Sequence, residues 1–266
     1  MSAPTKNRKS ISPGQIQQIL GFVRNIIEEL ALGFAQVQRV INDPERVAEF
    51  KEAIKPLLVK FFARSVGDLA LSLDPVDILE AWTQLWQKWD PKGIHNIVVP
   101  ELPYDSEHIQ REKDRGRGFI YLPSQLATVQ ALADLGKLFP KMQSWSVSGN
   151  DDAKKIKNTK DLSGWLSVEM ALNMPNPDTT EAGLREIFSQ QNAEGKTLNV
   201  YTVFGQFCRE VLGQYPDIPG YVRLLGTSSG GRVLFACFRE DGDLRVDHDW
   251  NPDGHDSDVG GRSVAV

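Results

Sequence analysis

Apolar residues recur every three or four positions through the N-terminal third of the chain. After a polar, basic tail over residues 1–12, this spacing predicts amphipathic helices, because it gathers the apolar side chains on one helical face. Asp43-Pro44 and Asp74-Pro75 are helix-start signals, each with aspartate as the N-cap and proline in the first turn. Asp90-Pro91 ends the last of these helices. Residues 13–90 are therefore predicted to form an antiparallel helical unit.

The pattern changes after this unit. Residues 91–118 hold six proline and glycine residues and the charged run QREKDRGRG, so they are predicted to form an exposed linker. Beyond residue 118, segments whose apolar residues recur every two positions alternate with segments whose apolar residues recur every three or four. Strands are predicted over 118–122, 143–147, 165–172, 221–226, 232–239 and 243–249, and helices over 124–139, 179–191 and 199–213. The expected fold is α+β, with residues 119–266 as a mixed domain that ends in antiparallel strands.

The strand predicted over 232–239 is apolar on both faces. Val233, Phe235 and Cys237 face one way, and the residues between them are also apolar, which is typical of a central, buried strand. Asp241-Gly242 suits a tight turn to the next strand.

Charge is concentrated at the C-terminal end. The chain has 30 Lys and Arg residues against 35 Asp and Glu residues, a net charge of -5. Three arginines occur from Arg239 onward, against eight acidic residues: Glu240, Asp241, Asp243, Asp247, Asp249, Asp253, Asp256 and Asp258. This segment alone therefore accounts for the whole net charge, and the remainder of the chain is balanced.

Composition narrows the class of protein. Hydrophobic residues at 41% and charged residues at 24% are typical of a folded globular chain. No apolar run reaches the roughly 20 residues that cross a bilayer, and no apolar segment follows the basic N-terminus as in a secretory signal. Cys208 and Cys237 lie in apolar surroundings that favour core packing over a reactive thiol. We expect a cytoplasmic chain with reduced cysteines, no membrane contact and, given its acidity, no dedicated nucleic-acid-binding face.

The segment 247–258, DHDWNPDGHDSD, is the strongest candidate for ligand chemistry. It matches the opening of a calcium-binding loop, in which alternating side-chain oxygens surround the ion and a glycine permits a sharp turn. The glutamate expected at the twelfth position is Gly260 here. The candidate calcium ligands are Asp249, Asn251, Asp253, Asp256 and Asp258. His248 and His255 offer a transition-metal set instead. An acidic surface loop without metal is the alternative, and no other cofactor is expected.

Two further features bear on binding. Residues 227–232, TSSGGR, lack the Lys-Ser/Thr ending of a phosphate-binding loop and precede a strand, so they are predicted to connect two strands. Trp82, Trp86 and Trp89 share one helical face, which forms either an aromatic platform for a partner or a packed core face. The residues predicted to contact a ligand are Ser228, Ser229, Arg232, Asp247, His248, Trp250, His255 and Asp256.

A looser pattern extends over roughly half of the chain. It consists of Phe139-Pro140 followed by Trp145, the pair Gly164-Trp165, the run 226–233 and the ending 261–266. On these residues the chain resembles an uncharacterised, multi-copy family of small proteins from reduced-genome bacteria. The family's usual proline after the loop and tryptophan in the following strand are absent. The resemblance implies a shared scaffold whose copies differ in their C-terminal loops, and it brings no catalytic role.

The residue alphabet of the C-terminal region is restricted. Residues 223–266 contain no Lys, Gln, Met or Ile, and only one Glu and one Trp. Codons that end in a pyrimidine produce this restricted set of residue types, as in targets of adenine-directed diversification. An acidic loop encoded in a GC-rich genome produces the same set.

The function predicted from these features is non-enzymatic binding of a protein or small molecule. The loops 227–231 and 247–261 would contact the ligand, and the N-terminal helices would support this domain or join copies of the chain. Two alternatives remain open. One is a metal-dependent enzyme that uses Asp249, Asp253, His255 and Asp256. The other is a nucleic-acid-associated accessory protein that uses the basic residues of the linker.

Overall fold

The computed structural model describes residues 42–49, 52, 64–142, 156–157, 160–218, 220–228, 232–250 and 253–265, with only the main chain described at 227, 228 and 248–250. The chain forms two compact units, residues 1–63 and residues 64–266. The predicted basic tail, the first helix and the strand over 143–147 lie outside the described residues. In the first unit, the Asp43 side chain accepts hydrogen bonds from the backbone N–H groups of Glu45 and Arg46 at 3.1 and 3.3 Å. This capping confirms the helix start predicted at Asp43-Pro44.

The second unit begins with two helices, α4 (Val66–Ala70) and α5 (Pro75–Trp89). Asp74 caps α5 by accepting a hydrogen bond from the backbone N–H of Val76 at 2.9 Å, as predicted. The side chains of Trp82, Trp86 and Trp89 are buried, so they form a core face of α5 and no exposed platform. Among the described residues, no helix is both long enough and apolar enough to cross a membrane.

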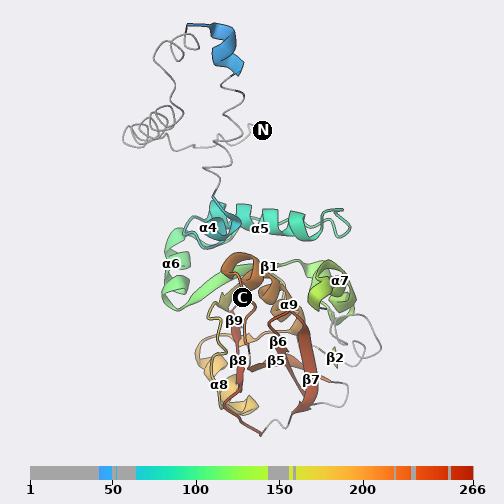
Figure 1. Cartoon of the computed structure of the whole chain (residues 1–266). Helices are drawn as coiled ribbons and strands as arrows, with labels where there is room; N and C mark the ends of the chain where they lie inside the picture. The colour runs from blue at the N-terminus through green and yellow to red at the C-terminus, as the bar shows by residue number, and fades with distance from the viewer. Residues whose placement is uncertain are drawn as a thin grey trace. The chain divides into compact units, whose positions relative to one another are not determined.

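Helix α5 covers the outer edge of a sheet. The indole N–H of Trp82 donates to the backbone oxygen of Phe119 at 3.1 Å, and that of Trp86 donates to Tyr121 at 3.2 Å. Both acceptors lie on β1 (Arg117–Leu122), an edge strand of the first sheet. Figure 1 shows α5 lying along β1. The two tryptophans therefore satisfy edge carbonyls that would otherwise be open to another chain.

Residues 91–118, predicted as an exposed linker, are structured in the second unit. Asp105 caps α6 (Ser106–Asp114), which buries Ile109 and Glu112. Glu112 pairs with Arg117 across 3.2 Å, and Arg117 begins β1. The sequence predicted a linker because the charged residues of a buried ion pair cannot be distinguished, in the sequence, from a run of charged residues exposed to solvent. The boundary between the compact units lies at 63/64 instead, so α5 belongs with the C-terminal residues.

The first sheet has the order β1-β3-β9-β4, with every pair antiparallel. It contains β3 (Gly164–Glu169), β4 (Glu194–Gly195) and β9 (Ser263–Ala265). The C-terminal strand β9 thus lies inside the sheet, between segments about 70 to 100 residues away in the sequence. The short strand β9 carries no alternating pattern long enough to predict it.

The helix predicted over 124–139 is wrong as one continuous element. The segment forms η1 (Ser124–Leu126), η2 (Val129–Ala131), α7 (Leu132–Leu138) and η3 (Pro140–Met142). The buried amide of Asn199 donates to the backbone oxygens of Leu126 and Thr128, both at 2.8 Å. This tertiary contact takes carbonyls that a continuous helix would use internally, and Thr128 is extended, with ψ 157°.

The second sheet has the order β2-β5-β6-β7, and β8 pairs with β5 in parallel. Its strands are β2 (Ile156–Lys157), β5 (Tyr221–Ser228), β6 (Val233–Phe238), β7 (Leu244–Trp250) and β8 (Val259–Gly261). Every residue of β6 is buried, which confirms the predicted central strand. The backbone N–H of Gly242, at φ 92°, donates to Arg239 at 2.9 Å in the predicted turn.

Two helices complete the unit, α8 (Glu181–Gln190) and α9 (Leu198–Phe207), and α9 continues as a π-helical turn over Cys208–Leu212. Gly205 allows α9 to approach the second sheet, because a Cβ there would meet the Phe238 ring at 2.1 Å. The α+β fold class is confirmed.

Candidate functional site

One end of the second sheet gathers several predicted ligand contacts. Thr227 of β5 pairs with Val233 of β6, and Val233 pairs with Trp250 of β7. The main chains of Ser228, Arg232 and Trp250 therefore lie at the same end of the sheet. Ser229 lies outside the described residues, as do the side chains of Ser228, His248 and Trp250.

The remaining candidates lie on the connection between β7 and β8. Strands β5 and β7 are both antiparallel to β6, so β7 and β8 run in the same direction on opposite sides of the β5–β6 pair. The connection therefore runs from the end of β7 to the start of β8 on the other side of the β5–β6 pair. Its described residues, 253–258, are called the strap. The strap contains His255, Asp256 and Asp258 and leads to Val259, which pairs with Tyr221 at the other end of β5.

The strap and the first part of β7 direct polar side chains to solvent. The strap residues with exposed side chains are Asp253, His255, Asp256, Ser257 and Asp258. On β7, Leu244 and Val246 are buried, whereas Arg245 and Asp247 are exposed. Asp247 pairs with Phe235 within the sheet. The described candidate contacts are thus divided between β7 and the strap.

Groups outside the strap hold its main chain. The Arg223 side chain, only 3% exposed, donates to the backbone oxygens of Thr179 and Gly254 through its two terminal nitrogens. The backbone N–H of Asp178 donates to Asp256 at 3.0 Å, and that of Tyr221 donates to Asp258 at 2.7 Å. Apart from the Thr179 oxygen, the acceptors are strap backbone oxygens, so these hydrogen bonds do not involve the strap side chains.

The strap contacts a turn at residues 176–178, in which two residues have a left-handed backbone conformation. Asn176 and Asp178 have φ values of 52° and 55°, a conformation that asparagine and aspartate adopt more readily than most residues. The Asn176 amide donates to the backbone oxygen of Gly261 at 3.0 Å. A Cβ at Gly260 would meet the oxygen of Pro175 at 2.4 Å, so the close approach requires glycine there. The Asn-Pro-Asp sequence signals a turn, but no local pattern identifies the strap as its partner.

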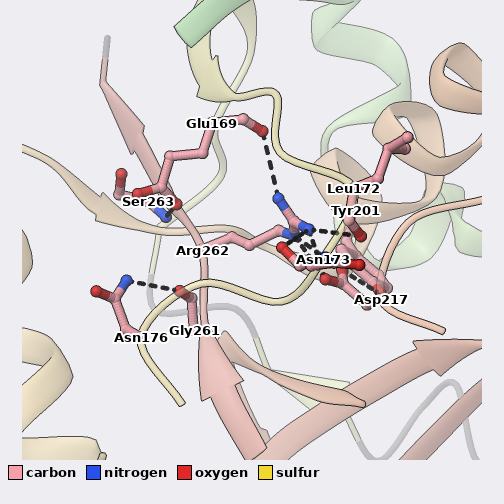
Figure 2. A network of polar contacts seen from close by, with 9 residues as sticks. All are labelled: Glu169, Leu172, Asn173, Asn176, Tyr201, Asp217, Gly261, Arg262 and Ser263. Atoms are coloured by element: carbon pink, nitrogen blue, oxygen red, sulfur yellow. Dashed lines mark hydrogen bonds and ion pairs between the residues drawn. The ribbon is translucent and has the colours of Figure 1, made fainter. Parts of the chain in front are cut away.

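The chain beyond the strap is fixed by a buried ion pair that sequence analysis missed. Figure 2 shows the Arg262 guanidinium directed at Asp217. Arg262 Nε lies 2.9 and 2.8 Å from the two carboxylate oxygens of Asp217, and the Tyr201 hydroxyl donates to the same carboxylate at 2.9 Å. Arg262 also donates to the backbone oxygen of Asn173 at 3.0 Å. Burial lowers the pKa of Arg262, but the bonds to Asp217 outweigh it, and the pKa lies above its ordinary value.

A lysine and a cysteine lie next to this pair in the core. Lys196 is fully buried, its Nζ has no hydrogen-bond partner among the described residues, and it lies 3.2 Å from the Phe204 ring centroid. Burial, and then the charge of Arg262, lower its pKa well below 10.5. Burial raises the pKa of the Cys208 thiol to about 12. Cys208 therefore remains a protonated core thiol at neutral pH, as predicted, and Cys237 is likewise free and buried.

The predicted metal set is only partly described. Within the described ranges, no group of three or more His, Cys, Asp or Glu side chains is arranged to hold a metal ion. His255 Nδ1 lies 2.7 Å from Asp178 Oδ1, and both side chains are largely exposed. Because Asn251 and the Asp249 side chain lie outside the described residues, the calcium loop stays a prediction.

Comparison with protein-family models, with curated proteins and with solved structures gives no match.

Proposed function

We propose that this chain is a binding protein that presents the side chains of the strap and of β7 to a cationic partner. The observation that carries the proposal is the separation of two roles along the strap. Its backbone is held by Arg223, Asp178 and Tyr221, whereas its own side chains face solvent. A loop held in this way can exchange its contact residues while keeping its conformation, as recognition loops on a rigid scaffold do.

The restricted residue alphabet supports the same reading. Buried positions of β6 and β7 are Val, Leu, Phe, Ala and Cys, whereas exposed positions of β7 and the strap are Arg, Asp, His and Ser. Substitution at the exposed positions leaves the sheet and the strap anchors unchanged. This is what a family of copies that differ in their C-terminal loops requires.

Charge indicates the class of partner. The segment from Arg239 onward carries the whole net charge of -5, and Asp247, Asp253, Asp256 and Asp258 are exposed on it. Such a surface attracts a basic partner and repels phosphate, so a basic protein surface suits it better than nucleic acid.

Affinity capture with matched variants tests the proposal. The strap variant replaces three exposed aspartates with asparagine: Asp253→Asn, Asp256→Asn and Asp258→Asn. The control variant changes net charge equally at exposed glutamates elsewhere: Glu101→Gln, Glu107→Gln and Glu186→Gln. We expect a partner bound by the unchanged chain and by the control to be lost from the strap variant. Equal capture of every partner by the strap variant would contradict the proposal.

A further inference from the structure

The two sheets of the second unit differ in what contacts their outer strands, β1 and β7. On β1, the tryptophan indoles of α5 occupy edge carbonyls of Phe119 and Tyr121. At the corresponding edge of the second sheet, β7 pairs only with β6 among the described strands. Figure 1 shows β7 as the outer strand of this sheet. One long edge is thus covered, and the other is not covered by any described strand.

Strand β7 has the dimensions of a strand-addition site. It runs for seven residues, and Leu244–Asp247 pair with β6 in unbroken register before the shift near Val233. In an antiparallel pair, alternate residues direct their backbone N–H and C=O groups away from the neighbouring strand. About half of the β7 residues therefore offer backbone donors and acceptors to an added strand. Strand β7 contains no proline, which would block such pairing.

The side chains of β7 define what an added strand must carry. Leu244 and Val246 face the core, and Arg245 and Asp247 face solvent, so a partner strand with apolar and polar residues in alternation continues both faces. The adjacent turn adds Glu240, Asp241 and Asp243 to the acidic side. A partner strand that carries lysine or arginine is therefore favoured, because it is attracted to this acidic end of the sheet.

We propose that β7 is a docking edge for an extended, basic peptide segment of a partner protein, which adds to the second sheet as a further strand. The inference rests on the proposed binding function and specifies that the partner binds as an extended strand. A second copy of this chain is the competing occupant. Pairing two β7 edges brings together two segments of charge -5, which repel each other within a Debye length of about 8–10 Å, whereas a basic strand is attracted.

A synthetic peptide and its backbone-blocked analogue test this inference. The probe is a fluorescent decapeptide of alternating lysine and valine, added to the full chain at low salt. The analogue carries N-methyl groups on alternate amides, which remove hydrogen-bond donors and keep every charge. We expect the probe to slow amide hydrogen exchange across Leu244–Trp250, and the analogue to bind at least about tenfold more weakly, since several hydrogen bonds of about 1 kcal/mol are lost.

Two charge reversals separate the edge from the strap. Asp247→Lys puts a lysine on the β7 edge, and Asp256→Lys makes the same charge change at an exposed strap position. We expect Asp247→Lys to weaken probe binding about tenfold and Asp256→Lys to weaken it less, because both reduce the attraction for a basic strand and only the first adds an edge-blocking charge.

Three outcomes overturn the inference. The first is equal binding of probe and analogue without protection of β7, which shows attraction by charge alone; the proposed function then stands if Asp256→Lys weakens this binding. The second is β7 protection that rises with protein concentration in the absence of probe, which assigns the edge to a second copy. The third is no probe binding at all, in which case the proposed function is still judged separately by capture with the strap variant.

Discussion

Asp217 and Arg262 show how much of this fold depends on a single pair of side chains. Both side chains are fully enclosed and lie 45 residues apart in the sequence (Figure 2). Removing one partner of a buried pair leaves the other charge without compensation. Asp217→Asn isolates this effect, because asparagine also accepts the left-handed backbone at φ 61°.

We expect Asp217→Asn to lower the free energy of unfolding by about 3–5 kcal/mol in urea titrations at pH 7. The control is Asp134→Asn, which breaks the exposed Lys137–Asp134 pair at 2.8 Å and should cost less than about 1 kcal/mol. Equal losses of unfolding free energy for the two variants would show that the buried pair stabilises the fold no more than an exposed pair does.

Lys196 gives the protein a pH-dependent stability. Its pKa in the folded chain lies well below 10.5, so the unfolded chain binds more protons between these two values, and stability rises with pH across that window. Lys196→Met removes the buried amine, so we expect greater stability below pH 10.5. The difference from the unchanged chain should shrink as pH rises toward 10.5, by up to about 1.4 kcal/mol per pH unit. Urea unfolding at about pH 8, 9 and 10 measures this, and Lys137→Met, at an exposed position, should show no such trend.

At the scale of an element, we expect the strap to depend on Arg223 more than on the exposed side chains of Asp256 and Asp258. Arg223→Met removes the hydrogen bond to Gly254 and the bond to Thr179 that fixes the guanidinium. We expect faster amide exchange in the strap and a loss of about 1–3 kcal/mol of unfolding free energy. The double variant Asp256→Asn and Asp258→Asn should leave both quantities nearly unchanged. If that variant destabilises the strap as much as Arg223→Met does, the backbone is not held from outside.

Element prediction succeeded where periodicity and capping are local. Asp74 and Pro75 identify the start of α5, and the two apolar faces of β6 identify a buried strand. Prediction failed where tertiary contacts replace local hydrogen bonds, as when Asn199 takes carbonyls of Leu126 and Thr128. The strands β8 and β9 have three residues each, too few to show a period.

At the scale of the whole molecule, residues 64–266 form a compact unit of their own. We expect this fragment to unfold cooperatively by itself, in urea titrations followed by tryptophan fluorescence. The shorter fragment 119–266, which begins after the linker expected from the sequence, loses α5, the two indoles that cover β1 and the first two residues of β1 itself. It should fail to fold cooperatively or should aggregate through that edge. A cooperative transition in the shorter fragment would place the domain boundary where the sequence suggested.

The distribution of charge in the sequence identified the segment that forms the candidate surface, but only the fold shows how its residues are arranged. The sequence alone placed the net charge of -5 on the C-terminal segment and identified Asp247, His255 and Asp256 as candidate contacts. It did not indicate that Asp247 lies on an outer strand of a sheet while His255 and Asp256 lie on the strap that connects β7 to β8. The anchors Arg223 and Asp178 were missed because neither stands in a motif.

Sequence by itself therefore determined the α+β class, the helix starts, the buried central strand and the location of the charge. Each follows from neighbours a few residues apart, through capping or the periodicity of helix and strand. Tertiary structure decided which edge is covered, how the strap is held and which charges are buried together. Those features join residues such as Asp217 and Arg262, or Trp82 and Phe119, whose proximity depends on the path of the whole chain and leaves no local pattern.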